Sequence, residues 1–156
     1  MAQTVKVEGL RELERALEEL PRSTGKSVLR RVLKKRAQPI ANAMRSKAPV
    51  DIEDGGQLRD SVGVGTKLSK RQRGLHRKAF KNDKASVEMF VGAGPLPQAH
   101  LTEFGGPNNA PAGWARSSWD AGKDELLDGL KADLWAEIEK AAQRHARKMA
   151  RLARKG

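Results

Sequence analysis

DAGKDELLDGLKADLWAEIEKAAQRHARKMARLAR, residues 120–154, is the stretch that decides the fold, because it predicts one long helix. Its expected inner stripe recurs every three or four residues and consists of Leu127, Leu130, Leu134, Ile138, Ala141, His145, Met149 and Leu152. That spacing places the stripe on one face of a helix. The first half of the stretch is acidic and the second half basic, which suits the helix macrodipole. At about 1.5 Å per residue the helix would be roughly 50 Å long.

Two further helices are predicted in the amino-terminal third of the chain. The apolar face of the first consists of Leu10, Leu13, Leu17 and Leu20. Pro21 ends this helix, and Ser23 or Thr24 is expected to cap the second one. The apolar stripe of the second helix consists of Leu29, Leu33, Ala37, Ile40 and Met44. Pro39 lies inside this pattern, so it should kink or split the helix, which ends at Ala48.

The middle of the chain has the pattern of strands and loops. Residues 61–65 and 86–92 alternate apolar and small or polar side chains, as half-buried strands do. The segment 67–84 between them is too polar to bury, and we expect a solvated hairpin extension there. Residues 94–113 contain four prolines, so they are expected to form a loop with one short helical turn at 99–104.

Length and composition set the class of protein. The 156 residues fit a single domain spanning 1–156, and the absence of cysteine excludes a disulfide scaffold. No apolar run approaches the roughly 18 residues of a membrane span, and no secretory signal follows Met1. We therefore expect a soluble α+β protein, made inside a cell, with no membrane partner. Its small, mostly antiparallel sheet would pack with two N-terminal helices and one long C-terminal helix, preceded by a strand-like segment at Val5–Val7.

The net charge of +12 is concentrated in separate blocks. Residues 22–48 carry nine basic groups and no acid, residues 61–84 carry eight against one acid, and residues 140–156 carry seven and no acid. Polyanions are the natural partners of such blocks. Sequence-independent DNA binding therefore stays open, although three Phe, three Trp and no Tyr leave few rings for base stacking.

Residues for catalysis or metal binding are sparse. The three histidines, His76, His100 and His145, are isolated in sequence. His100 and Glu103 can share a helical face, but two ligands do not make a metal site. The acidic residues 51–54 lack the ligand spacing of a calcium loop. No phosphate loop, dinucleotide fingerprint or nucleophile elbow is present. We therefore expect no enzymatic activity, no metal and no cofactor.

Several short motifs occur in order along the chain. They are Val7–Leu13, Ala48–Pro49, Gly56–Val62, Ala99–Gly106 and Trp114–Arg116. Together they resemble the small neck proteins of long-tailed bacteriophages, also called head–tail joining or tail-completion proteins, which have relatives in gene transfer particles. The resemblance spans roughly residues 5–120.

The chain departs from the family pattern at three places. Gly55-Gly56 stands where the family has Thr-Gly, and Gly106 stands where it favours Thr. Residues 113–118 replace a Pro-Phe-Leu-Arg-Pro-Ala ending, so Trp114 keeps an aromatic in the Phe position but the second Pro is absent. These differences leave the fold expectation intact and affect the detail of neighbour contacts.

The resemblance implies a non-enzymatic component of a virion neck or tail end, assembled in the host cytoplasm. It would be one subunit of a ring of about six copies, in contact with neighbouring neck and tail proteins. The expected subunit-interface residues are Leu58, Arg59, Glu103, Phe104, Trp114 and Arg116. The residues expected to face genomic DNA in the channel, or an acidic neighbour, are Lys67, Lys70, Arg71, Arg73, Arg77, Lys78 and Lys81. The long last helix could reach an adjacent ring or subunit.

The motif residues also allow readings that do not need the family. Gly56 can supply a positive φ at a turn, after which Leu58 would anchor the start of a strand in the core. Arg59 is either a surface charge or the partner of Glu103 or of an acid on a neighbouring subunit. Phe104 is either the core residue of a turn or, with Trp114, an anchor between subunits. Trp119 and Trp135 are expected in the core.

Overall fold

A computed structural model describes residues 10–51, 53, 55–82 and 87–156 of the chain. The strand-like segment expected at Val5–Val7 lies outside the described residues. The elements in chain order are α1 (Leu10–Glu18), α2 (Arg22–Lys47), α3 (Gln57–Ser61), β1 (Gly63–Gly65), α4 (Lys70–Ala79), β2 (Phe90–Gly92), α5 (Pro97–Phe104) and α6 (Trp114–Ala153). The predicted α+β class is confirmed.

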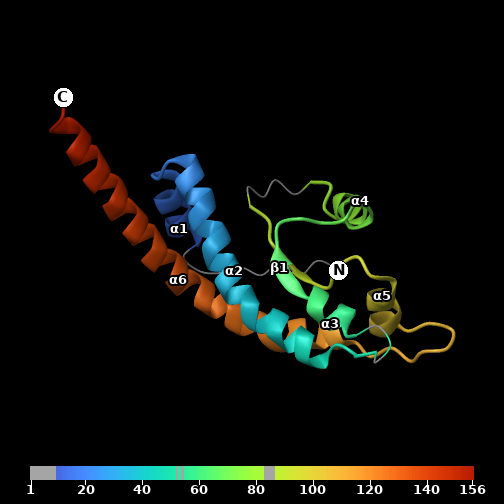
Figure 1. The fold of residues 1–156 in the computed structure, drawn as a ribbon. Helices are drawn as coiled ribbons and strands as arrows, with labels where there is room; N and C mark the ends of the chain where they lie inside the picture. Colours follow the sequence, from blue (N-terminus) through green and yellow to red (C-terminus); the bar gives the residue numbers. More distant parts are fainter. Residues whose placement is uncertain (1–9, 52, 54, 83–86) are drawn as a thin grey trace.

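The long helix α6 runs along the length of the molecule, and α2 packs along it (Figure 1). α6 begins at Trp114, six positions before the predicted residue 120. Its last buried residue is Ala141, and its carboxy-terminal end extends beyond α1 and α2 (Figure 1). The prediction that Trp119 and Trp135 lie in the core is wrong, because their exposed fractions are 42% and 41%. Both side chains lie off the face that α2 covers.

Helix α2 differs from its sequence-based prediction at its start and in its buried face. Pro21 occupies the N-cap position with no side-chain hydrogen bond, so neither Ser23 nor Thr24 caps the helix. Proline is suited to a helix start because its φ is already close to the helical value. The large apolar residues buried in the first half are Val28 and Val32, beside Gly25, whereas Leu29 and Leu33 are only partly buried.

Pro39 does not split α2, which runs without interruption from Arg22 to Lys47. A proline inside a helix removes one backbone hydrogen bond and crowds the preceding turn. The two residues that follow it, Ile40 and Ala41, are 2% and 0% exposed, and Ile40 packs against α6 at Gly122. Ala37, before the proline, is 7% exposed, so packing on both sides of the proline holds the helix together.

Two apolar clusters form the interior. The first joins α1, α2 and α6 and consists of Leu13, Leu20, Val28, Val32, Leu134, Ile138 and Ala141. The second lies near the other end of α2 and consists of Ile40, Ala41, Met44, Ala48, Leu58, Val62 and Trp114. The antiparallel strands β1 and β2 lie against this second cluster, with Gly63 opposite Gly92, Val64 opposite Val91 and Gly65 opposite Phe90.

The segment 67–84 was expected to be a hairpin extension, and this prediction is wrong because its centre is the helix α4. A reciprocal capping box starts the helix: the Gln72 N–H donates to Ser69 Oγ at 3.2 Å, and the Ser69 N–H donates to Gln72 Oε1 at 3.0 Å. Such a box satisfies two amide donors at a helix start. None of the residues of α4 is buried, in agreement with the expectation of a solvated segment.

Candidate subunit interface and basic surface

The start of α6 is attached to α5 by the side chain of Glu103, which is buried. Its Oε2 accepts a hydrogen bond from the backbone N–H of Ala115 at 2.8 Å, and its Oε1 accepts one from Arg116 at 2.9 Å. Amides in the first turn of a helix have no partner within the helix, and a carboxylate also favours the positive end of its dipole. Gly113 occupies the N-cap and has no side chain to do this, so Glu103 supplies the cap from another helix.

Trp114 fixes the same junction from inside the protein. Its side chain is 3% exposed, and its Nε1 donates to Thr102 Oγ1 at 3.1 Å. The backbone N–H of Ala112 donates to the carbonyl of Thr102 at 2.8 Å, and Ser118 Oγ donates to the carbonyl of Trp114 at 2.7 Å. Helix α5 is therefore held in one orientation relative to α6.

The outer surface of this junction is apolar. Phe104 is 64% exposed and Leu101 is 40% exposed, and the ring of His100 lies 5.0 Å from that of Phe104. Gly105 turns the chain away directly after Phe104, with a φ of 84° that favours glycine. The reading of Phe104 as a core residue is wrong. Of the two expected anchors, Phe104 is accessible and Trp114 is buried within the chain.

Leu58 and Arg59 lie on α3, near the second apolar cluster. Leu58 is 3% exposed, but it belongs to a short helix and not to the start of a strand as expected. Arg59 Nη2 donates to the carbonyl of Ala48 at 3.2 Å, and Arg59 Nε is buried without a hydrogen-bond partner in the described part of the chain. No ion pair or hydrogen bond joins Arg59 to Glu103 among the described residues; the Glu103 carboxylate accepts from the backbone of α6 instead.

The expected interface residues are therefore divided between two locations. Glu103, Phe104, Trp114 and the exposed Arg116 meet at the α5–α6 junction. Leu58 shares a cluster with Trp114 and supports the junction from within the core. Leu101 was not among the interface residues predicted from the sequence. An amphipathic pattern with Phe104 at a spacing of three residues on the short helix could have indicated it.

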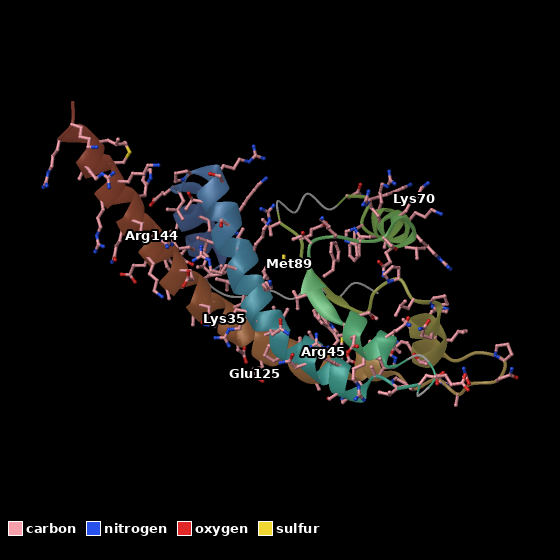
Figure 2. All side chains as sticks on the ribbon, viewed as in Figure 1. Lys35, Arg45, Lys70, Met89, Glu125 and Arg144 are labelled. Carbon is pink, nitrogen blue, oxygen red and sulfur yellow. The ribbon has the colours of Figure 1, made fainter. Side chains whose placement is uncertain are left out.

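The basic surface is centred on α4. Its cationic side chains are all exposed, and within the described residues none of them forms an ion pair; they are Lys67, Lys70, Arg71, Arg73, Arg77, Lys78 and Lys81. Figure 2 shows Lys70 on α4, on the opposite side of the sheet from the α2–α6 pair. Because none of these seven cations pairs with an acid among the described residues, their charges add up to a positive field around α4.

His76 attaches this basic helix to the sheet. Its ring lies 5.2 Å from that of Phe90 in an edge-to-face arrangement, and its Nε2 lies 3.7 Å from Glu88 Oε1. The same ring lies 4.8 Å from that of Phe80. Phe80 and Leu75 are 47% and 59% exposed, so apolar side chains are interspersed among the cations of α4. Neither Leu75 nor Phe80 was among the site residues predicted from the sequence.

Two arginines of α2 pair with acids of α6. Arg36 Nε donates to Asp133 Oδ2 at 2.6 Å, and Arg31 Nη1 donates to Glu137 Oε2 at 2.6 Å. The hydrogen bond from Arg36 holds the pKa of Asp133 below its ordinary value, and the same hydrogen bond raises the pKa of Arg36. These ion pairs form within the chain, so the basic block of α2 is partly neutralised.

Among the residues that the structure describes, no three His, Cys, Asp or Glu side chains lie close enough together to hold a metal ion. His100 and Glu103 lie on the same helix, but the carboxylate of Glu103 is already engaged by two amides. No helix in the described ranges is both long and apolar enough to cross a membrane.

Residues 11–105 match the family described as "Bacteriophage HK97-gp10, putative tail-component". The match covers more than half of the chain, from α1 through α5, and the protein therefore belongs to this family of phage tail components. Neither a curated protein nor a solved structure matches the chain. The family resemblance found in the sequence motifs is thus confirmed at the level of a structural component of the phage tail.

Proposed function

We propose that this protein is a non-enzymatic subunit of a ring in the neck of a phage or phage-like particle. The ring joins the tail to the DNA-filled head or completes the tail end, and it contains about six copies related by cyclic symmetry. Its partners are further copies of the chain and the neck and tail proteins on either side. The observation that carries this proposal is an exposed apolar pair, Leu101 and Phe104, on a junction that Glu103 holds rigid.

A contact surface is favoured at this junction because the side chains are exposed while their backbone is fixed. Glu103 and Trp114 order α5 before any partner binds, so little conformational entropy is lost on association. Aromatic side chains dominate the energetics of protein interfaces, and arginines are enriched there. Phe104 supplies an exposed aromatic side chain and Arg116 an exposed arginine at the same junction. Arg59 would face an acid on the neighbouring subunit.

The position of the protein in the particle is tested by quantitative mass spectrometry of purified complete virions, free heads and free tails. We expect a few copies per particle that fractionate with the neck or tail end. Absence from every fraction, despite expression of the protein, would contradict the proposal.

The contact role of Phe104 is tested by the variant Phe104→Asp. We expect it to fold with an unchanged circular dichroism spectrum and to be lost from particles, because an aspartate desolvated in an interface is costly. Val50→Asp is the control, since Val50 is an exposed apolar residue outside both α4 and the α5–α6 junction, and it should be incorporated normally. Normal incorporation of a folded Phe104→Asp would rule out this contact.

A second candidate function is sequence-independent DNA binding by α4 and its flanking lysines. The specific observation in its favour is that the seven cations of this segment form no ion pair in the described part of the chain. In a neck ring the same surface would face the DNA channel or an acidic neighbour. A channel that passes DNA cannot hold it tightly, so strong static binding favours the second function over the channel.

DNA binding is measured as a function of salt with duplexes of unrelated sequence. The logarithm of the affinity should fall linearly with the logarithm of salt concentration, with a slope of about −0.9 per phosphate contacted. Lys70→Glu, Arg73→Glu and Arg77→Glu together should flatten this slope. The matched control reverses three exposed cations of α2, Arg22, Arg30 and Lys34, and changes the net charge equally. An equal loss of DNA affinity in both variants would show that only the total charge matters and not the α4 surface.

A further inference from the structure

The last turns of α6 form a helix that nothing in the described part of the chain covers. Ala141 is the final buried residue, and α6 continues for a further 12 residues to Ala153, which is about 18 Å at 1.5 Å per residue. We call residues 142–155 the α6 tail. Figure 2 shows Arg144 at the start of this tail, beyond the part of α6 that α2 covers.

The α6 tail is both basic and amphipathic. It carries six cations and no acid, namely Arg144, Arg147, Lys148, Arg151, Arg154 and Lys155. Met149 and Leu152 continue the face of the buried Ile138, and they are 51% and 54% exposed. A short helix with like charges is marginal in water when nothing packs against it. This tail therefore has the composition of a surface that binds an acidic partner with an apolar centre.

An acidic surface with an apolar centre lies on the middle of the same helix, α6. Asp124, Asp128, Trp135 and Glu139 are spaced four, seven and four residues apart, which places them on one side of α6. All four are exposed, and none of the three acids forms an ion pair within the described residues. We call these four residues the acidic face. One base, the partly buried Lys131, borders it.

The tail and the acidic face cannot meet within one chain, because both lie on one continuous helix. They are complementary in charge, and each has an apolar centre, Met149 and Leu152 on the tail and Trp135 on the face. Arginine also binds to the face of a tryptophan ring by a cation–π interaction. Contact between two such surfaces of one chain type joins copies head to tail or pairs them across a two-fold axis.

We propose that the α6 tail of one copy docks on the acidic face of a second copy of this chain. Met149 and Leu152 contact Trp135, and the tail cations on their flank pair with Asp124, Asp128 and Glu139. The inference deepens the proposed ring function and rests on it for the head-to-tail arrangement of copies. The docking contact itself is measured on the purified protein, without particles.

The chain contains no cysteine, which allows the contact to be trapped by disulfide formation without background. The test variant carries Ala132→Cys beside the acidic face and Leu152→Cys on the apolar side of the tail. These positions are 20 residues apart on one helix, about 30 Å, so a disulfide must join two chains. The matched control carries Ala132→Cys and Ala150→Cys, because residue 150 lies about 160° around the tail from residue 152.

Nuclease-treated protein is oxidised at low salt and analysed by non-reducing electrophoresis, with mass spectrometry of the linked peptides. We expect a ladder or closed ring of chains linked between positions 132 and 152, about tenfold more than in the control. A covalent dimer with two such links would support the docking and contradict the ring. No link between positions 132 and 152, or a link that requires added duplex DNA, would overturn the docking.

Charge reversal on the same cysteine background gives the second arm. Reversing Arg144, Lys148 and Arg151 to Glu should reduce linkage about tenfold, as should reversing Asp124, Asp128 and Glu139 to Lys. Mixing the two reversed proteins should restore linkage, because the acidic tail of one then faces the basic surface of the other. Failure of the mixture to restore linkage, while both proteins remain folded, would overturn the proposed pairing.

Discussion

The guanidinium of Arg36 donates two hydrogen bonds to the carboxylate of Asp133, from Nε at 2.6 Å and from Nη2 at 2.9 Å. The pair joins α2 to α6 across 97 positions of the sequence. Gly129 lies beside it, and a Cβ at that position would collide with the Arg36 guanidinium. A two-pronged pair of this kind fixes orientation as well as distance. It therefore sets how α2 lies along α6.

We expect acid to weaken the fold partly through Asp133. The hydrogen bond from Arg36 lowers the pKa of Asp133 from its ordinary value of 3.8, so the unfolded chain takes up this proton first as the pH falls. The stabilisation is complete above the ordinary value and is lost as the pH falls through the lower folded value. Urea unfolding from pH 2 to pH 7 should show this loss in the native protein and less of it in Asp133→Asn. If the free energy of unfolding fell equally with pH in the native protein and in Asp133→Asn, the prediction would be wrong.

Gly122→Ala should destabilise the protein by about 1–3 kcal/mol, the usual cost of overpacking. A Cβ at this position would lie 2.6 Å from Cγ1 of Ile40, so α2 and α6 would have to move apart. Gly74→Ala is the matched control, because Gly74 is also helical but has no atom near its Cβ position. It should leave stability unchanged or raise it by up to about 1 kcal/mol. Chemical unfolding of both variants measures the difference, and equal stability would show that the α2–α6 contact relaxes freely.

Glu103→Ala should cost about 1–2 kcal/mol, as the loss of a helix cap does. The variant leaves the amides of Ala115 and Arg116 without their acceptor in a partly buried position. Glu103→Gln keeps one acceptor oxygen and should lose less stability than Glu103→Ala. Thermal unfolding and hydrogen exchange at the first turn of α6 provide the measurement. Unchanged exchange there in Glu103→Ala would show that the cap does not hold the junction.

Ser69→Ala should loosen α4 without unfolding the rest of the protein. Ser69 Oγ accepts the N–H of Gln72 in the capping box, and loss of such a cap costs about 1 kcal/mol. Because no residue of α4 is buried, that loss should appear as local opening. Hydrogen exchange should accelerate several-fold in residues 70–79 while α6 is unaffected. Faster exchange throughout the chain would mean that α4 unfolds together with the core.

Regular periodicity allowed three of the six described helices, α1, α2 and α6, to be predicted from the sequence. The four leucines from Leu10 to Leu20 predicted α1, and the stripe around Leu134 and Ile138 predicted α6. These patterns are reliable because a helix must bury one face. The start of α6 was missed because its cap is Glu103, twelve residues before Ala115 and on another helix. A local pattern cannot contain that information.

Side-chain type predicted burial less well than it predicted helices. Trp119, Trp135 and Phe104 are large and apolar, yet all three are exposed. Val28 and Val32 are buried in preference to their leucine neighbours, because the rotation of α2 is set by its contact with α6. Segment 67–84 was read as a loop because it is too polar to bury, although an exposed helix needs only a cap and good helix formers.

In the candidate interface too, the sequence predicted which residues belong to it better than which of them are buried. The motif around residues 99–106 identified Glu103 and Phe104 as neighbours of interest, but not which would face outward. Their opposite exposures, 8% and 64%, follow from where α5 meets α6.

The sequence by itself determined the helices with a strong apolar face, the family, and the separation of charge along the chain, since each is encoded in the order of neighbouring residues. The tertiary structure alone decided the cap at Glu103, the pair of Arg36 with Asp133 and the exposure of Phe104. Each of these depends on residues distant in the sequence, and only the packing of α2 and α5 against α6 brings them to a fixed position.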